Sequence, residues 1–132
     1  MDDKALAFLA DNHVAAMVTL RADGSPHVAR VAVGLVDGKL WSSGTRGRLR
    51  TKHLRRDPRA AFLVLGSANP WRWLGAEGRV RLHDGEDAPQ KNLALYRVIA
   101  GEPDDVEEYL DAMVKEGRLI YELEVERTYG AY

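Results

Sequence analysis

The sequence AAMVTLRADGSPHVARVAVGLVDGKLWSS, residues 15–43, contains three stretches rich in apolar and β-branched residues, separated by two short polar turns. Asp23-Gly24 and Asp37-Gly38 supply these turns, because glycine adopts a positive φ without a clash from a Cβ atom. Strands joined by such tight turns run antiparallel. We therefore expect a meander of strands at 15–21, 26–36 and 39–43, and not a parallel α/β sheet.

The rest of the chain alternates between helical and extended patterns. Helices are predicted at 2–12, 48–56 and 89–100, and a fourth helix is predicted from Pro103 to Gly117. Further strands are predicted at 59–65, 71–82 and 119–127. The first of these is apolar at every position from Ala60 to Leu65, which predicts burial on both of its faces. Since closure removes exposed strand edges, we expect one mainly β domain over residues 1–132, a six-stranded antiparallel β-barrel with peripheral helices.

The composition excludes several classes of protein. The chain has 132 residues, enough for one domain, and it has no cysteine, which excludes disulfides, thiolate catalysis and thiolate metal sites. The N-terminus lacks a cationic region followed by an apolar run, and no apolar stretch approaches the roughly 18 residues of a membrane span. We therefore expect a cytoplasmic protein without a membrane partner.

Charge is distributed unevenly along a chain whose net charge is −1. Residues 46–59 carry seven cations and one acid, whereas residues 84–126 carry thirteen acids and four cations. Where the loop meets the predicted helix at Arg48, unpaired backbone N–H groups attract anions, and arginine adds planar donors for phosphate oxygens. The segment indicates a phosphate site, with a solvated cationic helix face as the alternative. Nucleic-acid binding is disfavoured, because no aromatic residues for base stacking are interleaved with these cations.

Few other residues suggest chemistry. The four histidines are too far apart in sequence for a helical metal-binding pair, so no metal site is expected. His27 begins the second strand and either faces a ligand or lies partly exposed. Trp71 and Trp73 are two apart in a predicted strand, so they share a face and form either a wall for a flat ring or a packing contact. No catalytic acid–base pair is found, which suits a protein whose cofactor carries the redox chemistry.

Several segments together resemble a known family, the pyridoxamine 5'-phosphate oxidase-like, FMN-binding split β-barrel proteins. Within that family the chain is similar to the actinobacterial branch that uses the deazaflavin cofactor F420. The resemblance covers nearly the whole chain. It is carried by ALAFLADNH (5–13), TLRADGSPHV (19–28), RLRTKHLRRDPRA (48–60), WRWLGAEGRVRL (71–82), LYRVIAGE (95–102) and ERTYG (126–130).

This resemblance implies a split barrel that forms a homodimer, with two cofactor sites at the subunit interface. It implies that the cofactor ring lies against Pro26, His27 and Val28. The phosphate-bearing tail is expected at Thr45, Arg48, Arg50, Lys52 and His53. Trp71 and Trp73 of the second copy are expected beside the ring or the substrate.

The function implied is that of an F420H2-dependent oxidoreductase, which transfers a hydride to a small organic substrate. Seven cations suit a deazaflavin with a phosphodiester and an oligoglutamate tail better than FMN, which has one terminal phosphate. An FMN-dependent oxidoreductase of the same fold and a non-catalytic F420- or flavin-binding protein are the alternatives, since the family also includes proteins that bind FMN, FAD or haem. His27 and Arg30 are the candidates for polarising the substrate.

Overall fold

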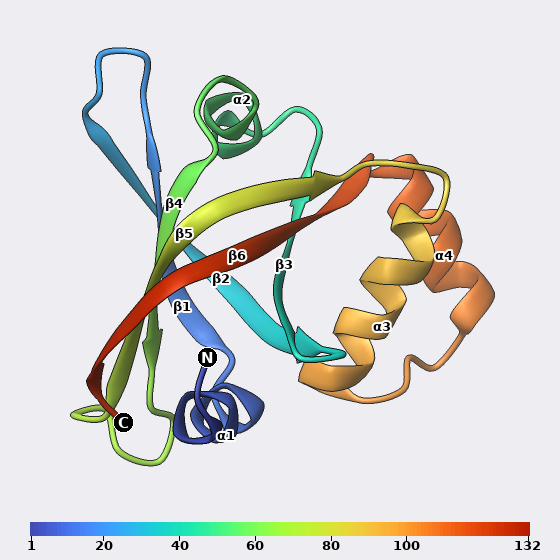
Figure 1. Cartoon of the computed structure of the whole chain (residues 1–132). Coiled ribbons are helices and arrows are strands. Elements are labelled where there is room, and N and C mark those ends of the chain that lie inside the picture. Colours follow the sequence, from blue (N-terminus) through green and yellow to red (C-terminus); the bar gives the residue numbers. More distant parts are fainter.

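The computed structural model describes all 132 residues, which form six strands and four helices in the expected order. In chain order the elements are α1 (Asp3–Asp11), β1 (Val14–Leu20), β2 (Pro26–Val36), β3 (Lys39–Thr45), α2 (Leu49–Arg56), β4 (Arg59–Leu65), β5 (Trp73–His83), α3 (Ala88–Ala100), α4 (Val106–Lys115) and β6 (Arg118–Ala131). The strands close into a barrel in the order β1-β2-β3-β6-β5-β4, and every neighbouring pair is antiparallel (Figure 1). The predicted barrel is confirmed.

The two glycine turns shape the meander as predicted. Asp37 and Gly38 have φ values of 52° and 76°, the positive pair that a two-residue hairpin turn requires. Gly24, in the first turn, also has a positive φ of 85°. The sequence AAMVTLRADGSPHVARVAVGLVDGKLWSS therefore forms β1, β2 and β3, which supply one side of the barrel.

The final strand closes the barrel and is longer than predicted. β6 extends to Ala131, whereas the apolar alternation predicted an end at Arg127. Its first half pairs with β3, and it also pairs with β5 from Ile120 to the end, past a register shift at Glu77/Gly78. Because pairing to β5 satisfies the backbone, the strand continues beyond the point where its alternation fades.

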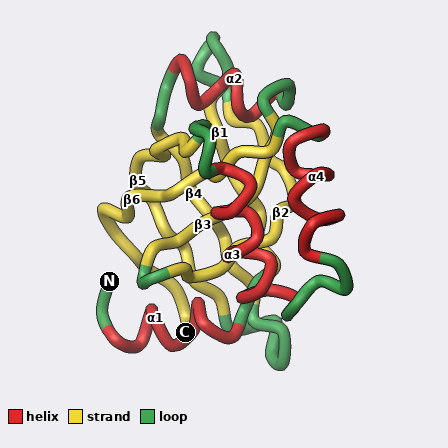
Figure 2. The backbone as a smooth tube through the Cα atoms, turned by 90° about the vertical axis from the view of Figure 1, so that its right-hand side faces the viewer, coloured by secondary structure: helices red, strands yellow, loops and turns green.

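The core fills the barrel interior and one of its ends. Seventeen buried residues form one cluster, which includes Met17, Phe62, Leu74 and Tyr121 from four different strands. α1 covers the lower end of the barrel in Figure 1 with Phe8 and Leu9, while α2 lies at the opposite end. Figure 2 shows α3 and α4 side by side on the outside of the barrel.

The prediction that β4 is buried on both faces is wrong. Phe62 and Val64 point inward and are buried. Leu63 and Leu65 alternate with them, point outward, and are 39% and 38% exposed. Across the sheet these two residues pair with Ala16 and Val14 of β1, so the apolar character continues over the outer face. No second layer of this chain covers that face, so the continuous run does not mark a double-sided core.

Two element starts also differ from the prediction. Trp71 precedes β5, which begins at Trp73, so the two tryptophans do not share a strand face. Pro103 lies before α4, whose N-cap is Asp105; the Asp105 side chain accepts a hydrogen bond from the backbone N–H of Glu108. None of the four helices has both the length and the apolar character needed to span a bilayer.

Candidate cofactor groove

A groove of about 510 Å³ opens on the outside of the barrel, between the outer faces of β2 and β3, the start of α2, and the helices α3 and α4. Arg30 and Ala32 line it from β2, and Arg48 and Arg50 line it where the chain enters α2. The opposite wall consists of Asn92, Tyr96, Tyr109 and Arg118, among others. A volume of this size suits a cofactor-sized ligand.

Hydrogen bonds fix the wall opposite the arginines. Ser43 Oγ of β3 donates to Asn92 Oδ1 of α3, and the Tyr109 hydroxyl of α4 donates to the Asn92 carbonyl at 3.1 Å. The rings of Tyr96 and Tyr109 lie 4.9 Å apart between their centroids. One asparagine therefore joins both helices to the barrel, which preorganises the groove before any ligand enters.

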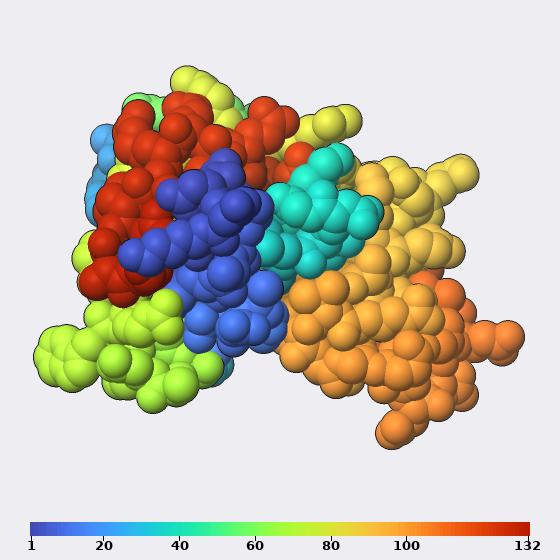
Figure 3. Space-filling model, turned by 60° about the horizontal axis from the view of Figure 1, so that its bottom comes forward, coloured from blue at the N-terminus to red at the C-terminus, as the bar shows by residue number.

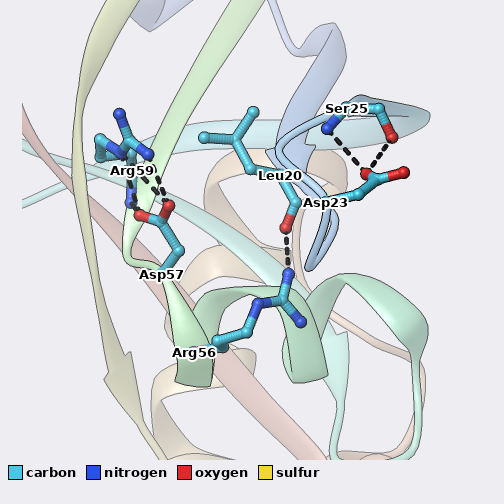
Figure 4. A network of polar contacts seen from close by, with 6 residues as sticks. All are labelled: Leu20, Asp23, Ser25, Arg56, Asp57 and Arg59. Atoms are coloured by element: carbon cyan, nitrogen blue, oxygen red, sulfur yellow. Dashed lines mark hydrogen bonds and ion pairs between the residues drawn. The ribbon is translucent and has the colours of Figure 1, made fainter.

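The structure divides the basic segment 46–59 into paired and free cations. Arg46 and Arg55 share Asp84, at 2.6 Å and 2.8 Å, although the Arg46 contact is poorly aligned for a hydrogen bond. Arg59 binds Asp57 at 2.8 Å, and Arg56 donates to the backbone carbonyl of Leu20 (Figure 4).

Three of the seven cations then remain without such a partner, namely Arg48, Arg50 and Lys52. Arg30 of β2 forms no ion pair either and joins Arg48 and Arg50 at the groove. The excess positive charge at the groove is therefore smaller than the segment's composition suggested, but it is concentrated in one place.

Arg50 is the most unusual of these cations. Its Nε atom is buried and has no hydrogen-bond partner, and the guanidinium carbon lies 5.7 Å from the ring centroid of Tyr121. Burial, the largest influence, holds the pKa of Arg50 below its usual value. A partly buried cation without an acid costs free energy, unless an anionic ligand occupies the adjoining space. Among the groove residues, Arg50 is therefore the one most suited to pair with an anion.

A second hollow, of about 380 Å³, lies on the outer face of β4 and β5 and lacks this feature. Its arginines are all neutralised: Arg59 by Asp57, Arg79 by Glu126 at 3.5 Å and Arg127 by Glu77 at 2.8 Å. It offers no unpaired charge, so the groove beside α2 is the better candidate for a cofactor.

The predicted residues of β2 separate onto its two faces. Pro26, Val28 and Arg30 point outward and are exposed, whereas His27 points toward the barrel interior. The His27 ring meets His53 of α2 edge to face, with 5.2 Å between the centroids, and its Nδ1 atom is buried without a partner. The structure therefore brings Arg30 to the groove but not His27.

The other predicted residues fall into three places. Thr45 ends β3, and its carbonyl accepts a hydrogen bond from the Thr51 hydroxyl at 2.6 Å. His53 is buried and forms a hydrogen bond with Thr19 at 2.9 Å, so it connects α2 to β1. Burial foremost, and then the neighbouring His27, lowers the pKa of His53. Lys52 lies exposed on α2.

Trp71 and Trp73 lie far from α2 in their own chain. They flank the start of β5, at the opposite end of the barrel, where Trp71 is 86% exposed (Figure 1). Figure 3 shows the loop that carries Trp71 projecting at the lower left, at a corner opposite α4. These rings can approach a groove only if it belongs to another copy of the chain.

Sequence reasoning missed the wall contributed by the C-terminal third. Tyr96 and Tyr109 belong to apolar helical stripes, which are typical of core packing. Arg118 is a single cation outside the basic segment, and it pairs with Glu116. None of these residues belongs to a motif that distinguishes a groove wall from an ordinary helix contact. Only the packing of α3 on β2, β3 and β6, and of α4 on α3 and β6, brings them together with Arg48 and Arg50.

The fold and groove together define a class: closed six-stranded antiparallel barrels with helices packed on the outside and a groove between the helices and the barrel. Comparison with known sequences agrees with this class, because the whole chain, residues 1–132, matches the pyridoxamine 5'-phosphate oxidase family. The chain belongs to that family.

Relatives and solved structures extend this finding. An F420H(2)-dependent biliverdin reductase of Mycobacterium tuberculosis is 31% identical over 132 residues, covering 99% of this chain and 88% of the relative. The crystal structure of a conserved hypothetical protein of M. tuberculosis, Rv2991, has a TM-score of 0.84 at 20% identity, over 99% of this chain and 84% of that one. An F420 reductase structure has a TM-score of 0.71 at 20% identity, over 93% and 94% of the two chains. The two structures share the fold with this chain.

Proposed function

We propose that this protein is an F420H2-dependent oxidoreductase that reduces an electrophilic carbon, such as a conjugated double bond or an imine, in a small organic substrate. The observation that carries the proposal is the unpaired, partly buried Arg50 at the groove, with Arg30 and Arg48 beside it. The reductase relative from M. tuberculosis supports the choice of cofactor.

The residues at the groove fit a phosphorylated, ring-bearing cofactor. Arg48 and Arg50 line the groove and would hold its phosphate together with Lys52, which is exposed on α2. Arg30, which also lines the groove, and Val28 on the same outward face of β2 would support its ring. When bound, a reduced deazaflavin supplies the hydride. The chain itself would orient ring and substrate and exclude water, and Arg30 is the candidate for polarising the substrate. His27 faces the barrel interior, so we assign it no contact with the substrate.

An FMN-dependent oxidoreductase is the second candidate. Three free cations in the basic segment, not seven, are enough for the single terminal phosphate of FMN, so the original charge count no longer favours F420. A protein that binds either cofactor without a substrate of its own is the third candidate. The preference for F420 now depends on the M. tuberculosis relative.

We also propose that the working form is a homodimer. The outer faces of β1 and β4 expose an apolar surface that includes Val14, Leu63 and Leu65, and this chain does not cover it. A contiguous apolar surface of this kind is typical of an interface. A second copy would also bring its Trp71 and Trp73 to the groove, which their own chain places out of reach.

The test is a fluorescence titration of the purified protein with F420, FMN and riboflavin, at low and moderate salt. We expect F420 to bind more tightly than FMN, and salt to weaken the binding because the contacts are ionic. Tighter binding of FMN would move the function to the second candidate, and failure of both to bind would refute a phosphate site. Oxidation of F420H2 should then be followed with biliverdin, the substrate in the relative's name, and with conjugated ketones and imines.

A further inference from the structure

We propose that Tyr121 is a positioning residue for the phosphate grip, defined here as Arg48, Arg50 and Lys52. This inference rests on the proposed function, because it concerns how the same groove holds its anion. Tyr121 lies on β6, has no exposed surface, and does not line the groove. It therefore acts on a ligand only through the residues that it contacts.

The first contact is a directed chain of hydrogen bonds. The Thr51 hydroxyl donates its one proton to the carbonyl of Thr45 at 2.6 Å. The Tyr121 hydroxyl also contacts Thr51 Oγ1, and it must be the donor there because the threonine proton is already used. The chain runs from β6 through the first turn of α2 to the end of β3. It ties down the two ends of the short loop that leads into the grip.

The second contact is with the grip itself. The tyrosine ring lies under the Arg50 guanidinium, 5.7 Å from ring centroid to Cζ. A contact with a ring face holds a cation in place without using its N–H donors. No acid pairs with Arg50. Tyr121 therefore fixes the direction of Arg50 while leaving that charge available to a ligand.

The neighbouring strand leaves room for this hydroxyl. A Cβ atom on Gly44 of β3 would overlap the Tyr121 hydroxyl and the ring carbon that bears it, so only glycine fits there. A phenylalanine at position 121 would fill the apolar core with the same ring. The hydroxyl and the glycine opposite it are the additional features, and the hydroxyl reaches α2 through its hydrogen bond to Thr51.

A merely structural role and a positioning role predict different ligand dependence. If the hydroxyl only stabilises the fold, its loss affects all ligands of the groove alike. If it orients the grip, its loss weakens ligands that carry a phosphate and spares their dephosphorylated forms. FMN with riboflavin, and F420 with F0, the same ring without phosphate and tail, are the two ligand pairs that separate these cases.

The experiment measures the Kd of each ligand for the full chain and for Tyr121→Phe, which keeps the ring beneath Arg50. We expect FMN and F420 to bind roughly three- to tenfold more weakly, the loss typical of one hydrogen bond, and riboflavin and F0 to be unchanged. Tyr132→Phe is the matched control, because the Tyr132 hydroxyl also meets a threonine, Thr128 at 3.2 Å, near the opposite end of the barrel. We expect that control to leave all four Kd values unchanged.

Thr51 provides a second variant if Tyr121→Phe does not fold. Thr51→Val removes the same hydroxyl chain and should reproduce the selective loss, while Thr51→Ser keeps the hydroxyl and should bind like the unaltered chain. Equal weakening within each ligand pair, or no weakening of FMN and F420, would overturn the positioning role. If the unaltered chain binds neither FMN nor F420, the proposed function itself fails, and this inference fails with it.

Discussion

Replacing Arg50 by alanine tests the groove most directly, because this side chain combines burial with the lack of an acidic partner. A charge-assisted hydrogen bond to a phosphate oxygen contributes about 1.5–3 kcal/mol, so we expect the cofactor Kd to rise roughly 10- to 100-fold. The stability of the ligand-free chain should respond differently. Arg50→Ala loses a cation–π contact of about 0.5–1 kcal/mol but also removes a partly buried charge, so the two effects oppose each other.

Two measurements on the same samples check this expectation. A fluorescence titration gives the Kd for F420 and for FMN, and urea unfolding without ligand gives the free energy of unfolding, which should change by less than about 1 kcal/mol. Arg55→Ala is the matched control, since Arg55 lies on the same helix but is paired with Asp84 at 2.8 Å. An unchanged Kd in Arg50→Ala, or an equal loss in Arg55→Ala, would refute the reasoning.

Three further predictions concern residues that support the site. The fold lowers the pKa of His53, so below about pH 6.5 the unfolded chain binds a proton that the folded chain does not. The free energy of unfolding should therefore decrease as the pH is lowered, and His53→Gln should flatten this dependence in urea unfolding. Leu63→Glu should convert the proposed dimer to a folded monomer, measured by light scattering after gel filtration, because Leu63 lies on the exposed apolar face. Gly44→Ala should lower the free energy of unfolding by roughly 1–3 kcal/mol, because the added methyl group overlaps Tyr121.

The second and third of these predictions have matched control variants. Val114→Glu introduces the same charge at an exposed apolar residue of α4, away from β1 and β4, and should leave the molecular mass unchanged. Gly47→Ala adds a methyl group that meets no atom within 4 Å and should be nearly neutral. A monomeric unaltered chain would contradict the second prediction. If His53→Gln keeps the pH dependence of the unaltered chain, the first prediction is wrong. If Gly44→Ala and Gly47→Ala are equally stable, the third prediction is wrong.

Much of the fold could be predicted because local signals specified it. Two Asp-Gly turns placed three strands, and strand alternation and helix periodicity placed the other elements. The outer face of β4 could not be predicted, because a continuous apolar run is the same in sequence whether a second layer, another copy or solvent meets it. The start of α4 was misplaced because Pro103 and Asp105 both signal a helix start, and only the hydrogen bond from Glu108 distinguishes them.

The candidate site could be predicted only in part, for a similar reason. The composition of residues 46–59 marked the right place, but it did not show which cations are free. Arg55 is neutralised by Asp84, which lies 29 residues further along the chain, and the same acid takes Arg46. That pairing depends on where β5 ends relative to α2, which is a property of the closed barrel.

The division of the predicted site between two ends of one barrel is itself an argument for a symmetric pair. β4 runs from α2 to the tryptophan loop, and its seven residues span about 20 Å, too far for Trp71 to reach its own Arg50. In the proposed dimer, a two-fold axis across the strands reverses their direction, so the loop of one copy approaches the α2 end of the other. The same contact would cover Leu63 and Leu65. One symmetry operation would therefore bury the exposed face of β4 and bring each tryptophan loop toward α2 of the other copy, and this makes loss of the dimer and loss of ring binding expected together in Leu63→Glu.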